Sequence, residues 1–364
     1  QEASRLFARA EINMGVEAFR DSLYSLLKRN TFLNIKFENM LDTLGEISRT
    51  DIRSLLGEWE KTTPLPFYSL GEPTLTKITN KGGEEFFVLK MLISNNSDYD
   101  GIIHMDIRKD GWWYQPLEDP RAKTKIEMPA HTSKEFVSVW EDQIRNVEIN
   151  TMVSGNLPNI ISQDINNVKQ ERNKIVKDSI YILPESSFDL PGEIIVDNED
   201  STLFILSAPP IVGLLPKWLD EVEETPFKYS GISWWRPPLQ WTATTNAKYY
   251  GKYIRSAYVI KSGDGSQTAT WKIPVPEAGQ YELYYHVFKD DELRWNNNLQ
   301  GEYHFKVKYG SEVEDAYVNL RKANEGWEQL GSYYFDSDTI RVVLTDECKL
   351  RSVTADAVKI VKRY

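Results

Sequence analysis

The sequence predicts a multidomain, mainly β protein: a short helical segment, then an immunoglobulin-like β-sandwich, then a jelly-roll-like β-sandwich. Three observations support this fold class. The chain has 364 residues, too many for one ordinary core. Apolar residues recur at helical spacing near the N-terminus, and from about residue 74 the period changes to two. Aromatic residues make up 12% of the chain, a high share that favours strands.

Residues 1–64 are predicted to be helical. The first apolar stripe is Leu6, Ile12, Val16, Phe19, Leu23, Leu26 and Leu27, and the second is Phe37, Met40, Leu41, Leu44 and Ile47. A third helix is expected from Thr50, its N-cap, to Trp59, with Pro64 and Pro66 ending it. The chain begins at Gln1 directly inside the first pattern. We therefore expect a piece of a longer polypeptide, whose helical tail this segment would be.

Residues 65–157 are predicted to form the first sandwich. Its strands are expected at residues 86–93 and 102–108, with a hairpin formed by residues 123–128 and 133–139. Residues 158–192 are polar and rich in Asn, and they contain three prolines. This composition predicts a connector, with a short helix near Gln163–Lys177.

Residues 193–364 are predicted to form the second sandwich. Short runs with period-two patterning and turn residues between them predict eight strands, at Arg255–Lys261, Gln267–Ile273, Gly279–Phe288, Tyr303–Tyr309, Asp315–Leu320, Glu328–Phe335, Thr339–Leu344 and Ala355–Val361. Within this region we expect Trp271 to anchor the core. We expect Asp356, which lies between two alanines, to be a buried hydrogen-bond acceptor.

Bulk properties exclude several classes of partner. A net charge of −11 disfavours nucleic acid, because a phosphate-binding surface needs a concentrated positive field. The single cysteine, Cys348, excludes an internal disulfide and a cysteine-based zinc site. The most apolar stretch, Leu203–Leu219, contains three prolines and a lysine, so no membrane-spanning segment is predicted.

No catalytic residues, metal site or cofactor are predicted in this chain. The four histidines are His104, His131, His286 and His304, and none stands in a His-Glu-x-x-His motif, which a zinc peptidase needs. Gly263–Ser266 lacks the context of a hydrolase nucleophile and is predicted to be a hairpin turn. The cluster of Asp197, Glu199 and Asp200 has the hard oxygen ligands that calcium prefers, but not EF-hand spacing. A solvated turn is the favoured interpretation, with calcium as the alternative.

Residues 193–364 resemble the golvesin/xanthan-lyase carbohydrate-binding-like domain. The resemblance is carried, in order, by Ile195–Asn198, Tyr250–Tyr253, Ala269–Tyr284, Gly326–Tyr333 and Thr354–Lys359. The chain departs from the family pattern at Ser201–Thr225, an apolar, proline-containing insertion. The resemblance implies a β-sandwich that binds carbohydrate and is appended to enzymes without being their catalytic part.

The first two regions resemble the C-terminal end of a gluzincin-type, aminopeptidase N-like zinc peptidase followed by an immunoglobulin-like sandwich. The residues that carry this resemblance are Leu55–Trp59, Leu65–Tyr68 and Ser154–Pro158. It implies that the upstream domains of a parent polypeptide are partners of this chain. It also implies an exported bacterial protein, located in the periplasm, on the cell surface or outside the cell.

An aromatic loop provides the candidate ligand-binding residues. Trp234, Trp235, Arg236 and Trp241 lie within eight positions beside two prolines, which favours an exposed platform for sugar rings. Packing of this loop against the insertion is an equal alternative. Trp295, which precedes three asparagines, is a further candidate.

Three functions stay open at this point. The preferred one is the non-catalytic C-terminal region of an exported peptidase-like protein, whose last domain binds carbohydrate or a cell-envelope polymer. The second is a structural spacer or interdomain brace without a ligand. The third is part of a zinc aminopeptidase whose catalytic motif lies upstream.

Overall fold

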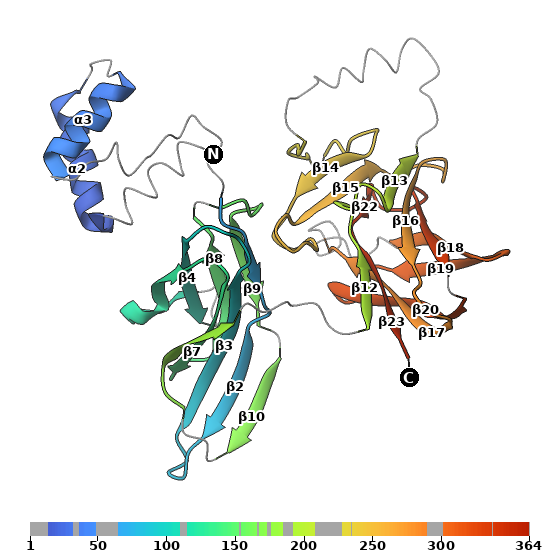
Figure 1. Cartoon of the computed structure of the whole chain (residues 1–364), viewed down its shortest axis with the longest axis horizontal. Helices are drawn as coiled ribbons and strands as arrows, with labels where there is room; N and C mark the ends of the chain where they lie inside the picture. The colour runs from blue at the N-terminus through green and yellow to red at the C-terminus, as the bar shows by residue number, and fades with distance from the viewer. Residues whose placement is uncertain are drawn as a thin grey trace. The chain divides into compact units, whose positions relative to one another are not determined.

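The chain folds into two compact units in the computed structural model (Figure 1). One consists of residues 1–155 and 159–186, the other of residues 156–158 and 187–364. The structure describes residues 14–31, 36–48, 65–109, 115–152, 154–165, 167–172, 176–184, 192–207, 228–233, 235–289, 301–336 and 338–363. Strands predominate in these ranges, and they form several separate sheets. The predicted fold class, multidomain and mainly β, is confirmed.

Among the described residues, two helices precede the strands of the first unit. They are α2 (Val16–Arg29) and α3 (Phe37–Ser48). Their apolar stripes meet in a small cluster that buries Phe19, Leu26, Leu41 and Leu44, as the helical spacing predicts. The helix expected at Thr50–Trp59 lies outside the described residues. Neither of these two helices has the length and apolar character needed to cross a membrane.

The described strands of the first unit form two sheets with a core between them. The first sheet has the order β10-β2-β3-β7-β11, with β1 also paired to β3. The second has the order β5-β4-β8-β9, with β6 also paired to β4. The bounds are β1 (Tyr68–Leu70), β2 (Thr74–Thr79), β3 (Glu85–Asn95), β4 (Gly101–Lys109), β5 (Gln115–Pro116), β6 (Lys123–Met128), β7 (Thr132–Trp140), β8 (Ile144–Asn150), β9 (Ile160–Asp164), β10 (Val168–Arg172) and β11 (Ser179–Pro184). Alternate residues of β3 and β4, among them Leu89, Met91, Ile103 and Met105, fill the core.

Much of the segment expected to be a connector is folded into this sandwich. Strands β9, β10 and β11 lie within residues 158–192 and pair with β8, β2 and β7. The short helix expected near Gln163–Lys177 is wrong, because β9 and β10 occupy that stretch. All three strands stand at sheet edges, where few side chains are buried and a polar composition is normal. That polar composition is what suggested a connector.

The described strands of the second unit form three sheets. Their orders are β12-β23-β17-β20, β13-β16-β21-β18-β19 and β14-β15-β22. The bounds are β12 (Glu193–Val196), β13 (Phe204–Ser207), β14 (Thr242–Thr245), β15 (Ser256–Lys261), β16 (Thr268–Pro274), β17 (Gly279–Val287), β18 (Glu302–Tyr309), β19 (Glu312–Asn319), β20 (Gly326–Phe335), β21 (Thr339–Thr345), β22 (Ser352–Ala355) and β23 (Val358–Lys362). One aromatic-rich core joins them and includes Trp271, Tyr285 and Phe305, each fully buried. The expectation that Trp271 anchors the core is confirmed.

The last strand expected from the sequence, Ala355–Val361, is wrong as a single element. Two strands, β22 and β23, flank a break at Asp356–Ala357 and belong to different sheets. The reason is the Asp356 side chain, which is fully buried and accepts hydrogen bonds from the backbone N–H of Tyr250 at 3.1 and 3.2 Å. The predicted role of Asp356 as a buried acceptor is confirmed, and this role interrupts the strand pattern.

Candidate binding surfaces of the C-terminal unit

The aromatic loop is built on a tight turn. The N–H of Arg236 donates to the carbonyl oxygen of Ser233 at 3.0 Å, which places Trp235 within the turn. Two prolines follow and restrict the backbone. The N–H of Lys261 donates to the Pro238 carbonyl at 2.7 Å, which fastens the loop to β15. These two backbone hydrogen bonds therefore hold the loop at its turn and at the point where it meets β15.

Trp235 is the most exposed large aromatic side chain in the described structure, with 81% of its surface accessible. The guanidinium carbon of Arg351 lies 5.1 Å from its ring centroid. A cation–π contact of this exposed kind contributes about 0.5–1 kcal/mol and orients the ring. Arg236 and Leu239 are also exposed. Together these residues present a flat apolar face with guanidinium donors beside it.

The other aromatic candidates differ from Trp235. Trp241 is half-buried and packs against the core of the unit. Its indole N–H is buried and makes no hydrogen bond within the described residues. Trp234 and Trp295 lie outside the described residues. The structure thus brings Trp235 and Arg236 together at the surface. It also places Arg351 beside them, a residue from a distant part of the sequence that no sequence motif marks.

The acidic cluster is held by internal hydrogen bonds. The Glu199 carboxylate accepts from Lys228 at 2.5 Å and from the Tyr229 hydroxyl at 3.0 Å, and it also contacts the Ser256 hydroxyl. Burial, and then the nearby charge of Asp356, raise the pKa of Asp197 well above its usual value. Across the described ranges, no group of three or more His, Cys, Asp or Glu side chains is placed to hold a metal ion. The cluster is an ordered network and differs from the solvated turn that the sequence favoured.

A carboxylate–imidazole pair lies at the end of β17. Nδ1 of His286 is 2.9 Å from Oδ2 of Asp356, and the imidazole ring packs edge-on against Tyr250 and Trp327. Burial raises the pKa of Asp356, and the neighbouring His286 opposes that rise. Because the same carboxylate also holds the Tyr250 backbone, this pair ties a loop to the sheet.

One protein-family model matches part of the chain. Residues 237–362 match the model of the golvesin C-terminal domain, which is less than half of the chain. This match confirms the golvesin part of the resemblance drawn from the sequence. No curated protein matches the chain.

Three solved structures share a limited similarity with this chain. Xanthan lyase from Paenibacillus is 16% identical, with a TM-score of 0.34, over 83% of this chain and 27% of that one. CBM35 from Cellvibrio japonicus Abf62 is 11% identical, with a TM-score of 0.22, over 32% and 77%. Aminopeptidase A from Legionella pneumophila is 17% identical, with a TM-score of 0.18, over 38% and 15%.

Proposed function

We propose that the C-terminal unit is a carbohydrate-binding module and that the surface formed by Trp235, Arg236 and Arg351 contacts the sugar. The observation that carries the proposal is the 81% exposure of the Trp235 indole on a loop anchored by backbone hydrogen bonds. An exposed, rigidly held aromatic ring is a sign of a binding site. The golvesin C-terminal domain match over residues 237–362 supports the same class of module.

The chemistry of this surface suits a sugar ring. The axial C–H groups of a pyranose form an apolar face that stacks on an indole, while its hydroxyls need hydrogen-bond partners. The guanidinium groups of Arg236 and Arg351 supply several donors in a planar arrangement. Leu239, exposed on the same loop, widens the apolar area. Binding of an extended glycan would bury this patch without a deep pocket.

A glycan array followed by affinity measurement tests the proposal. We expect the protein to bind at least one glycan, and we expect Trp235→Ala to weaken that binding about tenfold or more. Tyr334→Ala is the matched control, because Tyr334 is also an exposed aromatic residue, on β20. Unchanged affinity in Trp235→Ala would remove this surface from the proposal. Absence of any glycan binding would favour a spacer without a ligand.

We further propose that the module belongs to an exported bacterial protein related to zinc aminopeptidases. The support is the order of sequence motifs in Leu55–Trp59 and Leu65–Tyr68. The residues that would cleave a peptide bond must then lie upstream of Gln1. The coding sequence upstream decides this: a His-Glu-x-x-His motif there, with zinc bound to the longer protein, is the expected result. A coding sequence without it would end the peptidase part of the proposal.

A further inference from the structure

The outer face of the sheet β13-β16-β21-β18-β19 carries a row of three cations. Lys272 of β16 is the direct cross-strand neighbour of Arg341 of β21, and Arg341 is in turn the neighbour of Lys308 of β18. The residues that alternate with them along each strand, such as Trp271, Val342 and Val307, are buried in the core. All three cations therefore point away from the core, on one face.

These cations have no carboxylate partner within the part of the chain that the structure describes. No ion pair is formed by Lys272, Arg341 or Lys308 there, nor by Lys306, which lies in the next row between Val343 and Asp315. The carboxylate of Asp315 is instead bonded to Nε2 of His304 at 2.7 Å. Like charges directly opposite one another destabilise a sheet. The chain has a net charge of −11 and 54 acidic residues, yet no carboxylate among its described residues pairs with this row.

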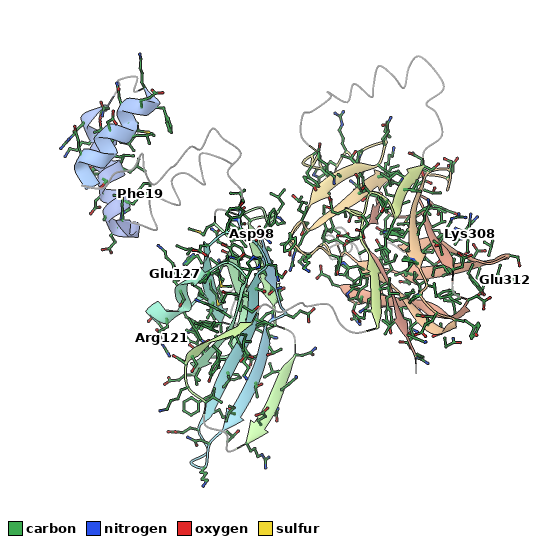
Figure 2. All side chains as sticks on the ribbon, in the orientation of Figure 1. Phe19, Asp98, Arg121, Glu127, Lys308 and Glu312 are labelled. Carbon is green, nitrogen blue, oxygen red and sulfur yellow. The ribbon has the colours of Figure 1, made fainter. Side chains whose placement is uncertain are left out.

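We propose that this cation row is a second binding surface, which takes an acidic polysaccharide lying across the strands. An anionic ligand would offset the repulsion within the row, in which Arg341 and Lys308 are exposed and Lys272 is half-buried. Figure 2 shows Lys308 in β18 of this sheet, within the β18–β19 hairpin that also contains Glu312. The surface uses none of the residues of the aromatic loop that contains Trp235 (the Trp235 loop). The inference therefore does not rest on the function proposed for that loop.

The spacing and the neighbouring side chains favour a glycan over an acidic peptide. Adjacent strands lie about 4.8 Å apart, so the row repeats at about the length of one sugar ring in an extended polysaccharide. The Tyr317 ring is 55% exposed and stacks on His304 at 4.8 Å with the rings nearly parallel, which offers a flat apolar face on the same side of the sheet. The hydroxyls of Thr268 and Thr270 lie on that side as well.

Binding of polygalacturonate to the full chain, measured by titration calorimetry at low and moderate salt, tests the inference. We expect binding that weakens as salt rises, because the contacts are between charges. Neutralising the row with Lys272→Gln, Arg341→Gln and Lys308→Gln should lower the affinity about tenfold or more and flatten its salt dependence. Fully methyl-esterified polygalacturonate, which has the same backbone without the charge, should bind much more weakly.

Three controls make the result specific. The triple variant Lys252→Gln, Lys289→Gln and Lys322→Gln removes the same charge from positions outside the sheet strands, and its affinity should stay within about twofold of the starting protein. Trp235→Ala should also leave polygalacturonate binding unchanged, which separates this surface from the Trp235 loop. Poly-glutamate tests the competing partner class. The inference is overturned by equal losses in both triple variants, by equal or tighter binding of poly-glutamate, or by no binding of polygalacturonate. A matching thermal unfolding midpoint for the two triple variants confirms that both are folded.

Discussion

The two outer faces of the C-terminal sandwich differ in whether their cationic side chains are paired with carboxylates. On the sheet β12-β23-β17-β20, Lys359 is bonded to Glu193 at 2.7 Å and lies over the rings of Trp327 and Tyr284, at 4.9 and 5.4 Å. Arg363 contacts the Glu282 carboxylate on the same face. On the other sheet, Lys272, Arg341 and Lys308 lie side by side, and none of the described carboxylates pairs with them. Since one face shows that this fold accommodates paired cations, the unpaired row is not a requirement of packing.

This contrast separates the charged side chains that stabilise the fold from those that are available to a ligand. Charges that are paired and partly buried become part of the folded structure, and removing one leaves its partner without compensation. Exposed charges without partners contribute little to stability, and they are available to bind a ligand. Substitutions on the paired face should therefore change the free energy of unfolding, whereas those on the unpaired face should change affinity.

The largest effect is expected at Asp356, which anchors His286 on the paired side. Asp356→Ala removes the acceptor for the Tyr250 N–H and for His286, so we expect a loss of about 2–3 kcal/mol in the free energy of unfolding. Asp356→Asn keeps one acceptor oxygen and should lose less. Urea denaturation followed by tryptophan fluorescence measures both. Equal losses in the two variants would show that the charge, and not the acceptor geometry, is what matters.

A smaller loss is expected when Lys359 is neutralised. Lys359→Met keeps the aliphatic stem against the aromatic rings but leaves the Glu193 carboxylate, which is only 16% exposed, without its partner. We expect the free energy of unfolding to fall by about 1–2 kcal/mol. A double-mutant cycle with Glu193→Gln isolates the pair. A coupling energy near zero would mean that the two faces do not differ in the way described.

The strands of the C-terminal unit were largely predictable because burial alternates along them. In β17, Tyr281, Leu283 and Tyr285 are buried while Tyr284 and His286 face outward, and this pattern is visible in the sequence. Strands β9 to β11 were missed because edge strands bury few residues. The break at Asp356 was missed because the backbone N–H that it accepts from lies more than a hundred positions away along the chain.

The two candidate surfaces were predictable to different degrees. Trp235 and Arg236 stand in one short segment, so their composition alone marked them. The cation row could not be found in this way, because Lys272, Arg341 and Lys308 are single charges on three separate strands. Only the pairing register places them opposite one another, and register depends on the whole sheet. Arg351 was missed for the same reason.

A pH effect is expected from Asp197, which is close to the buried Asp356. Its pKa is raised on folding, so the folded state binds its proton more tightly and stability falls as pH rises from about 4, near the unfolded pKa. Asp197→Asn removes this titration and should raise the free energy of unfolding by about 1 kcal/mol at pH 7. Near pH 3 the two proteins should match. Thermal unfolding at pH 3, 5 and 7 measures the trend, and a variant that is less stable at pH 7 would contradict it.

The smallest change in the free energy of unfolding is expected on the unpaired face, and the direction of this change is the test. Arg341 lies between Lys272 and Lys308, so Arg341→Thr relieves two like-charge contacts and places a good strand former in β21. We expect the free energy of unfolding to rise by about 0.2–0.5 kcal/mol at low salt, and the gain to shrink as salt screens the repulsion. Arg341→Lys, which keeps the charge, should show no gain. Urea denaturation at two salt concentrations measures both variants. If Arg341→Thr were destabilised by 1 kcal/mol or more, Arg341 would have a structural role, and the case that this row is kept for a ligand would fail.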